Sequence, residues 1–187
     1  MSTPPLRIAV LVGSLRQASY NRMVANTLPE LAPAGMEITL LPSLHPIPLY
    51  DGDVEAQGIP PAVTALAEAI RAADGLIIVT PEYNYSVPGV LKNAIDWLSR
   101  LPKQPFAGKP VALQSASMGP FGGARSQYHL RQVLIYLNPR VLNVPEVMVG
   151  TVQNKVDAAA GRLADQSSRD HIAAQLAKFA EFVRTGA

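Results

Sequence analysis

A short polar segment near the N-terminus, residues 13–21, has the composition of an anion-binding loop. It follows an apolar run, residues 8–12, and leads into helical spacing from Arg22. The first main-chain N–H groups of a helix have no partner within it, and the helix dipole favours negative charge there. Hydroxyl and amide groups suit phosphate oxygens, and a guanidinium can neutralise their charge through a forked contact. The side chains expected to bind a phosphate are Ser14, Arg16, Ser19 and Asn21.

The same loop has a simpler interpretation, in which Ser19 or Asn21 only caps the following helix. A cap needs one oxygen and no cation, so the additional Ser14 and Arg16 favour a phosphate pocket. The segment has no Gly-Lys-Ser/Thr ending, the chain has no cysteine, and no acidic residue closes the first strand. These features exclude a P-loop, a phosphocysteine intermediate and a phospho-acceptor aspartate. We therefore expect the loop to hold a phosphate without attacking it.

Composition limits the class of protein. The chain has 187 residues, of which 48% are hydrophobic and 16% charged, so we expect one domain, residues 1–187, with a full core. No apolar run approaches the roughly 18 residues of a membrane helix, and no secretory signal is visible, so a cytoplasmic location is expected. The absence of cysteine excludes a disulfide framework and thiolate catalysis. A net charge of +2 with scattered basic residues predicts no nucleic-acid partner, and it differs from the acidic surface of many diffusing electron carriers.

The elements that must position this loop alternate along the chain. Strand patterns are predicted at residues 8–12, 36–41, 76–79, 111–115 and 141–149, the last broken by Pro145. Helical patterns are predicted at residues 22–28, 61–73, 90–101, 124–137 and 168–183, and the proline-rich residues 42–61 are predicted to form an irregular surface loop. Five strands and five helices in alternation predict an α/β fold, a doubly wound three-layer sandwich around a five-stranded parallel sheet.

In such sheets ligands bind at the carboxyl ends of the strands, where the strand order reverses. With the order 2-1-3-4-5, the loops that begin at Gly13 and Thr80 are neighbours, and the loop after Ser115 lies beside them. The second loop carries tyrosines, an asparagine and a glutamate between two prolines, and the third carries serines and three glycines. Glycines let a main chain approach a flat ligand closely. A phosphate pocket beside these loops suggests a planar heterocycle on a phosphorylated tail, and FMN is such a ligand.

Three segments resemble the NAD(P)H-dependent FMN reductase family, a flavodoxin-like group that includes bacterial quinone, chromate and azo reductases. They are Gly13-Ser14-Leu15-Arg16-x-x-Ser19-x-Asn21, Thr80-Pro81-Glu82-Tyr83-Asn84-Tyr85-Ser86-x-Pro88-Gly89-x-Leu91-Lys92-Asn93-Ala94-x-Asp96-Trp97 and Ser115-x-Ser117-x-Gly119-x-x-Gly122-Gly123. The second motif is specific, whereas the first and third are weak alone. The resemblance covers nearly the whole chain, in order.

The resemblance implies a role for each matching position. It implies that the first motif binds the FMN phosphate through Ser14, Arg16, Ser19 and Asn21. It implies that the isoalloxazine edge lies along Pro81, Glu82, Tyr83, Asn84 and Tyr85. It implies that the pyrimidine side of the ring is closed by Ser115, Met118 and Gly119.

The resemblance also implies a reaction. NADPH or NADH would deliver hydride to the flavin and leave before an acceptor binds, which is a ping-pong mechanism. The acceptors would be small molecules: quinones, flavins, azo compounds or metal oxyanions. No side chain is expected to act as a catalytic nucleophile or acid, because the cofactor carries the chemistry. A homodimer or homotetramer is implied, and neither a membrane partner nor a metal site is expected.

Alternatives remain open at this point. A one-electron flavodoxin carrier or a non-catalytic flavin-binding module would share the fold, whereas a hydrolase is disfavoured because no triad order or elbow motif is present. At the level of residues, Glu82 has an alternative role as an ion-pair partner, and Tyr83 and Tyr85 as loop anchors. Arg125 and Tyr128, three residues apart on one predicted helix, are either a subunit contact or plain surface.

Overall fold

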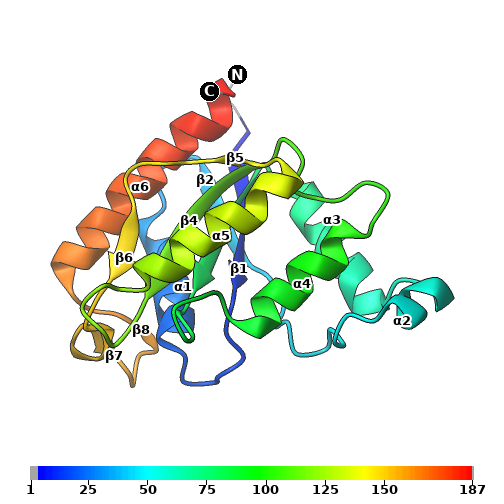
Figure 1. Ribbon diagram of the computed structural model, residues 1–187. Helices are drawn as coiled ribbons and strands as arrows, with labels where there is room; N and C mark the ends of the chain where they lie inside the picture. Colours follow the sequence, from blue (N-terminus) through cyan, green and yellow to red (C-terminus); the bar gives the residue numbers. More distant parts are fainter. Residues whose placement is uncertain (1–3, 187) are drawn as a thin grey trace.

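The computed structural model describes residues 4–186, and a parallel sheet forms its centre (Figure 1). The strands are β1 (Leu6–Val12), β2 (Met36–Leu40), β3 (Gly75–Thr80), β4 (Pro110–Ala116), β5 (Arg140–Val141) and β6 (Val147–Val149). The order is β2-β1-β3-β4-β5, and β6 also pairs with β4. All of these pairs are parallel. The predicted order is confirmed, and it places the reversal between β1 and β3, as in flavodoxin-like folds.

The fifth position of the sheet differs from the prediction. Instead of one strand over residues 141–149, the short strands β5 and β6 pair with opposite ends of β4. The break between them contains Pro145, which has no N–H to donate to a ladder. A small antiparallel hairpin, β7 (Val156–Asp157) and β8 (Arg162–Leu163), was not predicted at all. The predicted count of five strands is therefore wrong, although the five positions in the sheet are right.

Two helical layers cover the sheet. Helices α1 (Tyr20–Leu31) and α6 (Gln166–Thr185) pack on one face, and helices α3 (Pro61–Ala72), α4 (Gly89–Ser99) and α5 (Ala124–Leu137) pack on the other. Every residue of β3 and β4 is buried, because both faces of these central strands are covered. Within residues 4–186, no helix combines the length and the hydropathy that a membrane crossing requires.

The proline-rich region predicted to be an irregular loop contains one short helix, α2 (Gly52–Gln57), which projects at the edge of the molecule (Figure 1). None of its residues is buried. The segment before it is anchored from α4, where Asn93 Nδ2 and Trp97 Nε1 both donate to the Pro48 carbonyl, at 2.8 and 2.9 Å. The Tyr50 N–H donates to Asn93 Oδ1 at 2.8 Å. Trp97 is fully buried, so it belongs to the core.

The N-terminus of α6 provides a pH-dependent element of stability. The Asp165 carboxylate accepts hydrogen bonds from the Ser168 hydroxyl at 2.6 Å and the Ser168 N–H at 2.9 Å. These bonds hold the pKa of Asp165 below its ordinary value of 3.8. A carboxyl group with a lowered folded-state pKa stabilises the fold fully above its unfolded pKa, and that contribution disappears as the pH falls through the folded pKa.

We therefore expect Asp165→Ala to lower the midpoint of thermal unfolding at pH 7 because the cap is lost. The difference from wild type should shrink as the pH falls below 3.8, and calorimetry between pH 7 and acid measures it. Asp165→Asn is the matched control, since it keeps a neutral acceptor and should differ little in its pH dependence from the alanine variant. A difference between wild type and Asp165→Ala that stays constant with pH would contradict the assignment.

Candidate functional site

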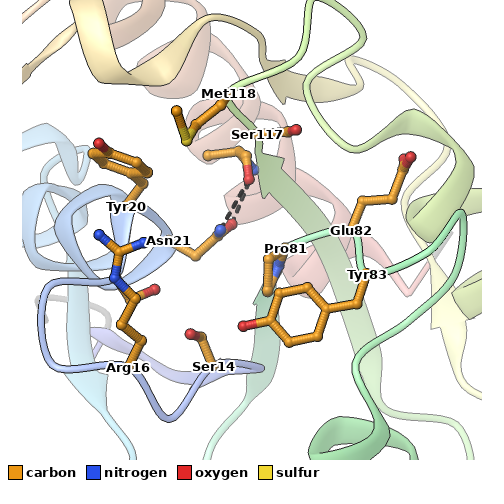
Figure 2. Close-up of a pocket in the computed structure, with 11 residues that line it drawn as sticks. Ser14, Arg16, Tyr20, Asn21, Pro81, Glu82, Tyr83, Ser117 and Met118 are labelled. Atoms are coloured by element: carbon orange, nitrogen blue, oxygen red, sulfur yellow. Dashed lines mark hydrogen bonds between the residues drawn. The ribbon is translucent and has the colours of Figure 1, made fainter.

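A cleft of ≈ 250 Å³ opens at the carboxyl ends of β1, β3 and β4 (Figure 2). The loops that follow these three strands form its walls, so the structure brings together the three segments that the sequence singled out. The lining residues are Ser14, Arg16, Ser19, Tyr20, Asn21, Pro81, Glu82, Tyr83, Ala116, Ser117 and Met118.

The first loop leaves β1 through a tight passage. The Gly13 N–H donates to the Val79 carbonyl at 2.9 Å. A Cβ on Gly13 would lie 3.0 Å from both Leu91 Cδ2 and Thr80 Oγ1, which is tighter than an ordinary contact. Glycine is therefore what lets the loop pass so close to the ends of β3 and α4. Beyond it the loop turns into α1, whose N-terminal N–H groups have no partners within the helix.

Ser19 combines the two roles that the sequence left open. It is the N-cap of α1, and its Oγ accepts from the Arg22 N–H at 3.3 Å. It also lines the cleft, together with the buried Ser14. Capping and ligand contact are thus compatible at this position.

Arg16 supplies a positive charge at the same end of the cleft. Its side chain is exposed, and its guanidinium carbon lies 5.4 Å from the centre of the Tyr20 ring. Among residues 4–186, no carboxylate forms an ion pair with Arg16. A guanidinium without an internal counter-charge, beside two hydroxyls and a helix N-terminus, is well suited to an anion.

The second loop makes a tight turn beside the cleft. Tyr83 and Ser86 exchange two main-chain hydrogen bonds of 3.0 Å, and the central residues Asn84 and Tyr85 have φ of 48° and 66°. Positive φ at both central residues is typical of a type I′ turn, and it is unfavourable for a bulky side chain such as Tyr85. Tyr83 lines the cleft, whereas Asn84 and Tyr85 lie at the exposed tip of the turn and do not line it.

Glu82 holds this turn against α5. Its side chain is only 8% exposed, and its carboxylate accepts from Arg125 Nε at 2.6 Å. It also accepts from the main-chain N–H groups of Arg125 and Ser126, at 3.1 and 3.4 Å. Helix α5 begins after Gly123, which has no side chain to cap it, so the carboxylate takes the place of an N-cap. The hydrogen bond that Arg125 donates to Glu82 also raises the pKa of the Arg125 guanidinium.

Ser115, near the end of β4, stabilises the third loop, which follows this strand. This residue is fully buried, and its Oγ donates to the Gly122 carbonyl at 2.7 Å and accepts from Gln127 Nε2 at 2.8 Å. A Cβ on Gly122, whose φ is 60°, would lie 2.6 Å from the main chain of Met148. The loop therefore needs glycine to cross β6. Ser115 and Gly119 do not line the cleft, whereas Met118 does.

Three lining residues, Tyr20, Ala116 and Ser117, are not among the predicted contacts. Ser117 belongs to the glycine-rich motif, which was the available signal for it. Tyr20 lies between two predicted residues, Ser19 and Asn21, and Ala116 lies between Ser115 and Ser117 of the third motif. Neither residue type by itself signals a ligand contact.

Comparison with known proteins agrees with this geometry. Residues 6–154 match the family model for NADPH-dependent FMN reductases. The chain is 61% identical to a quinone reductase of Escherichia coli over 180 residues, and 52% identical to an NAD(P)H-dependent FMN reductase of Pseudomonas aeruginosa over 179 residues, with 96% of each chain covered in both cases. Among solved structures, the flavoenzyme NAD(P)H:(acceptor) oxidoreductase FerB of Paracoccus denitrificans has a TM-score of 0.86 at 31% identity, covering 97% of this chain and 98% of the other. The chain belongs to the NADPH-dependent FMN reductase family of oxidoreductases.

Proposed function

We propose that this enzyme uses FMN to take hydride from NADPH or NADH and passes the electrons to quinones by a ping-pong mechanism. The observation that carries the proposal is the cleft in which three loops meet, with the Arg16 guanidinium, which has no ion-pair partner among residues 4–186, at one end. The names of the Escherichia coli and Pseudomonas aeruginosa relatives, a quinone reductase and an NAD(P)H-dependent FMN reductase, support these substrates. Flavins, azo compounds and metal oxyanions are proposed as further acceptors.

The donors in the cleft fit FMN. Arg16, the hydroxyls of Ser14 and Ser19, and the N-terminus of α1 lie at one end, where a phosphate needs positive charge and hydrogen-bond donors. The rest of the cleft is walled by Pro81, Tyr83 and the segment that ends at Met118, which suits a flat ring. When bound, FMN supplies the hydride and electron chemistry, so the protein needs to supply only binding, orientation and charge.

The remaining predicted residues have supporting or rim roles in this proposal. Asn21 and Glu82 hold the first two loops in place through hydrogen bonds to other segments, and Ser115 holds the third through its bonds with Gly122 and with Gln127 of α5. Asn84, Tyr85 and Gly119 lie outside the lining and are proposed to form the rim that an incoming ligand passes.

The mouth of the cleft supports alternate binding of donor and acceptor. Figure 2 shows Tyr83 and Met118 on opposite sides of it, and the two residues are 49% and 59% exposed. A planar nicotinamide or quinone could contact either side chain from solvent. Because one mouth serves both substrates, the first product would have to leave before the acceptor enters.

We further propose that residues 1–187 form one FMN-binding domain that self-associates as a homodimer or homotetramer in the cytoplasm. Tyr85, Phe121 and Tyr128 are 67%, 64% and 50% exposed. The guanidinium carbon of Arg125 lies 3.7 Å from the centre of the Tyr85 ring and 5.4 Å from that of Phe121, and Tyr128 follows Arg125 by three residues on α5. A cluster of exposed aromatic rings is typical of a protein interface. Sedimentation equilibrium tests the expected assembly.

Anaerobic stopped-flow spectroscopy tests the reaction. NADPH or NADH alone should bleach the flavin absorbance of the purified holoenzyme, and a quinone added afterwards should restore it. Steady-state double-reciprocal plots at several quinone concentrations should be parallel. A protein that is reduced only by one-electron donors would instead be a carrier, and a protein that binds no flavin would be a non-catalytic module. Either result would refute the proposed function.

A further inference from the structure

The sequence assigned Asn21 to the phosphate, but the structure gives its side chain a different partner. Asn21 is the second residue of α1 and is 3% exposed. Its Nδ2 donates to the Ala116 carbonyl at 2.9 Å, and the Ala116 N–H donates to its Oδ1 at 2.9 Å (dashed lines in Figure 2). Both the donor and the acceptor of the carboxamide are therefore hydrogen-bonded to the main chain of the last residue of β4.

The main chain of Ala116 needs such a partner because the neighbouring strand has ended. Ser117, the next residue, donates to Val149 and accepts from Val152, so it pairs on the β6 side. By the alternation of a strand, Ala116 faces the β3 side. The ladder between β3 and β4 ends at the pair Thr80–Ser115, where β3 itself ends. The carboxamide of Asn21 pairs with the main chain of Ala116 just beyond that end.

This pairing connects two walls of the cleft. On one side, Asn21 lies in the first turn of α1, directly after the loop that carries Arg16 and ends at the N-cap Ser19. On the other side Ala116 is followed directly by Ser117 and Met118, which line the opposite wall. Two buried hydrogen bonds therefore fix the distance between the end that would bind the phosphate and the wall that would face the ring.

We propose that Asn21 is a positioning residue, which holds the first and third loops at the spacing that lets one FMN molecule contact both. The inference rests on the proposed function. A positioning role and a direct phosphate contact predict different results. Loss of a positioning carboxamide should disturb binding of the ring as much as binding of the phosphate. Small displacements of a binding wall can reduce affinity or rate by up to about 100-fold.

The test compares FMN with riboflavin, which lacks the phosphate, in titrations of the apoprotein. Asn21→Ala should weaken both ligands by similar factors, on the order of 10-fold, and should shift the visible spectrum of bound FMN. Arg16→Ala should weaken FMN and leave riboflavin unchanged. The matched control is Asn26→Ala on the same helix, because Asn26 Nδ2 also donates to a main-chain carbonyl, that of Gly161, at 3.1 Å. Asn26 does not line the cleft, so this variant should bind both flavins as wild type does.

Hydrogen exchange in the apoprotein gives a readout that needs no flavin. The Ala116 amide should be protected in wild type and in Asn26→Ala, and should exchange faster in Asn21→Ala. If Asn21→Ala does not fold, Asn21→Asp keeps the size and the acceptor for the Ala116 N–H but loses the donor to the Ala116 carbonyl. It should weaken riboflavin, which carries no phosphate for the carboxylate to repel.

Three results would overturn the inference. The first is that Asn21→Ala weakens FMN but changes neither riboflavin binding nor exchange of the Ala116 amide. The second is no effect of Asn21→Ala on either flavin, and the third is a wild-type Ala116 amide that exchanges without protection. Failure of the wild-type protein to bind FMN would instead refute the proposed function, and the exchange experiment would still report on the hydrogen bonds of Asn21.

Discussion

Arg16→Ala is expected to weaken FMN binding by about 10- to 100-fold without changing the stability of the apoprotein. The side chain is exposed, and within residues 4–186 no carboxylate pairs with it, so its removal leaves no buried group unsatisfied. A hydrogen bond between charged groups contributes about 1.5–3 kcal/mol, and each 1.4 kcal/mol is roughly a factor of ten in the dissociation constant. The expected loss follows from one such contact with the phosphate.

Fluorescence titration of apoprotein with FMN measures this loss. Arg22→Ala is the matched control, because it removes the same charge from a neighbouring residue that does not line the cleft. Arg16→Lys should recover part of the affinity, since it keeps the charge but not the forked geometry. If Arg16→Ala binds FMN as tightly as Arg22→Ala does, the phosphate lies elsewhere.

Glu82→Ala is expected to have the largest effect on stability, lowering the free energy of unfolding by about 2–3 kcal/mol. The variant removes the acceptor for two N–H groups at the start of α5 and for Arg125 Nε. Loss of a partner from a fully buried pair costs about 3–5 kcal/mol. The cost should be lower here because the Arg125 side chain is 38% exposed, and water can solvate the charge that is left.

Urea denaturation of the apoprotein measures this change. Glu82→Gln should lose less, because the amide oxygen still accepts from the N–H groups of α5. Glu181→Ala is a control for an exposed pair, since Glu181 contacts Lys178 at 2.8 Å and surface pairs contribute little. A Glu82→Ala variant as stable as Glu181→Ala would show that this carboxylate does not cap α5.

Helices and strands were predictable where the hydrophobic pattern of the sequence matches the burial of the residues in the structure. Strands β3 and β4 are buried along their whole length and consist mainly of apolar residues because both faces are covered, and the predicted limits of helix α5, residues 124–137, match the structure. Short elements were not predictable. Helix α2 buries none of its residues, so no hydrophobic period marks it, and β5 to β8 have two or three residues each.

The sequence by itself determined the alternation of strands and helices and the three polar loops, because these are local properties. The strand order, and with it the convergence of the three loops, was expected from known folds with this alternation and from the family resemblance. Only the tertiary structure decided what the side chains of these loops contact. Asn21, Glu82 and Ser115 were singled out as ligand contacts, yet all three are hydrogen-bonded within the protein. Asn21 and Glu82 bond to segments distant in the sequence, and Ser115 bonds to Gly122 of its own loop and to Gln127 of α5. A polar side chain that binds a ligand and one that satisfies a buried main-chain group have the same residue type. The difference lies in which main-chain N–H or carbonyl group the fold brings within hydrogen-bond distance, and no local pattern encodes that.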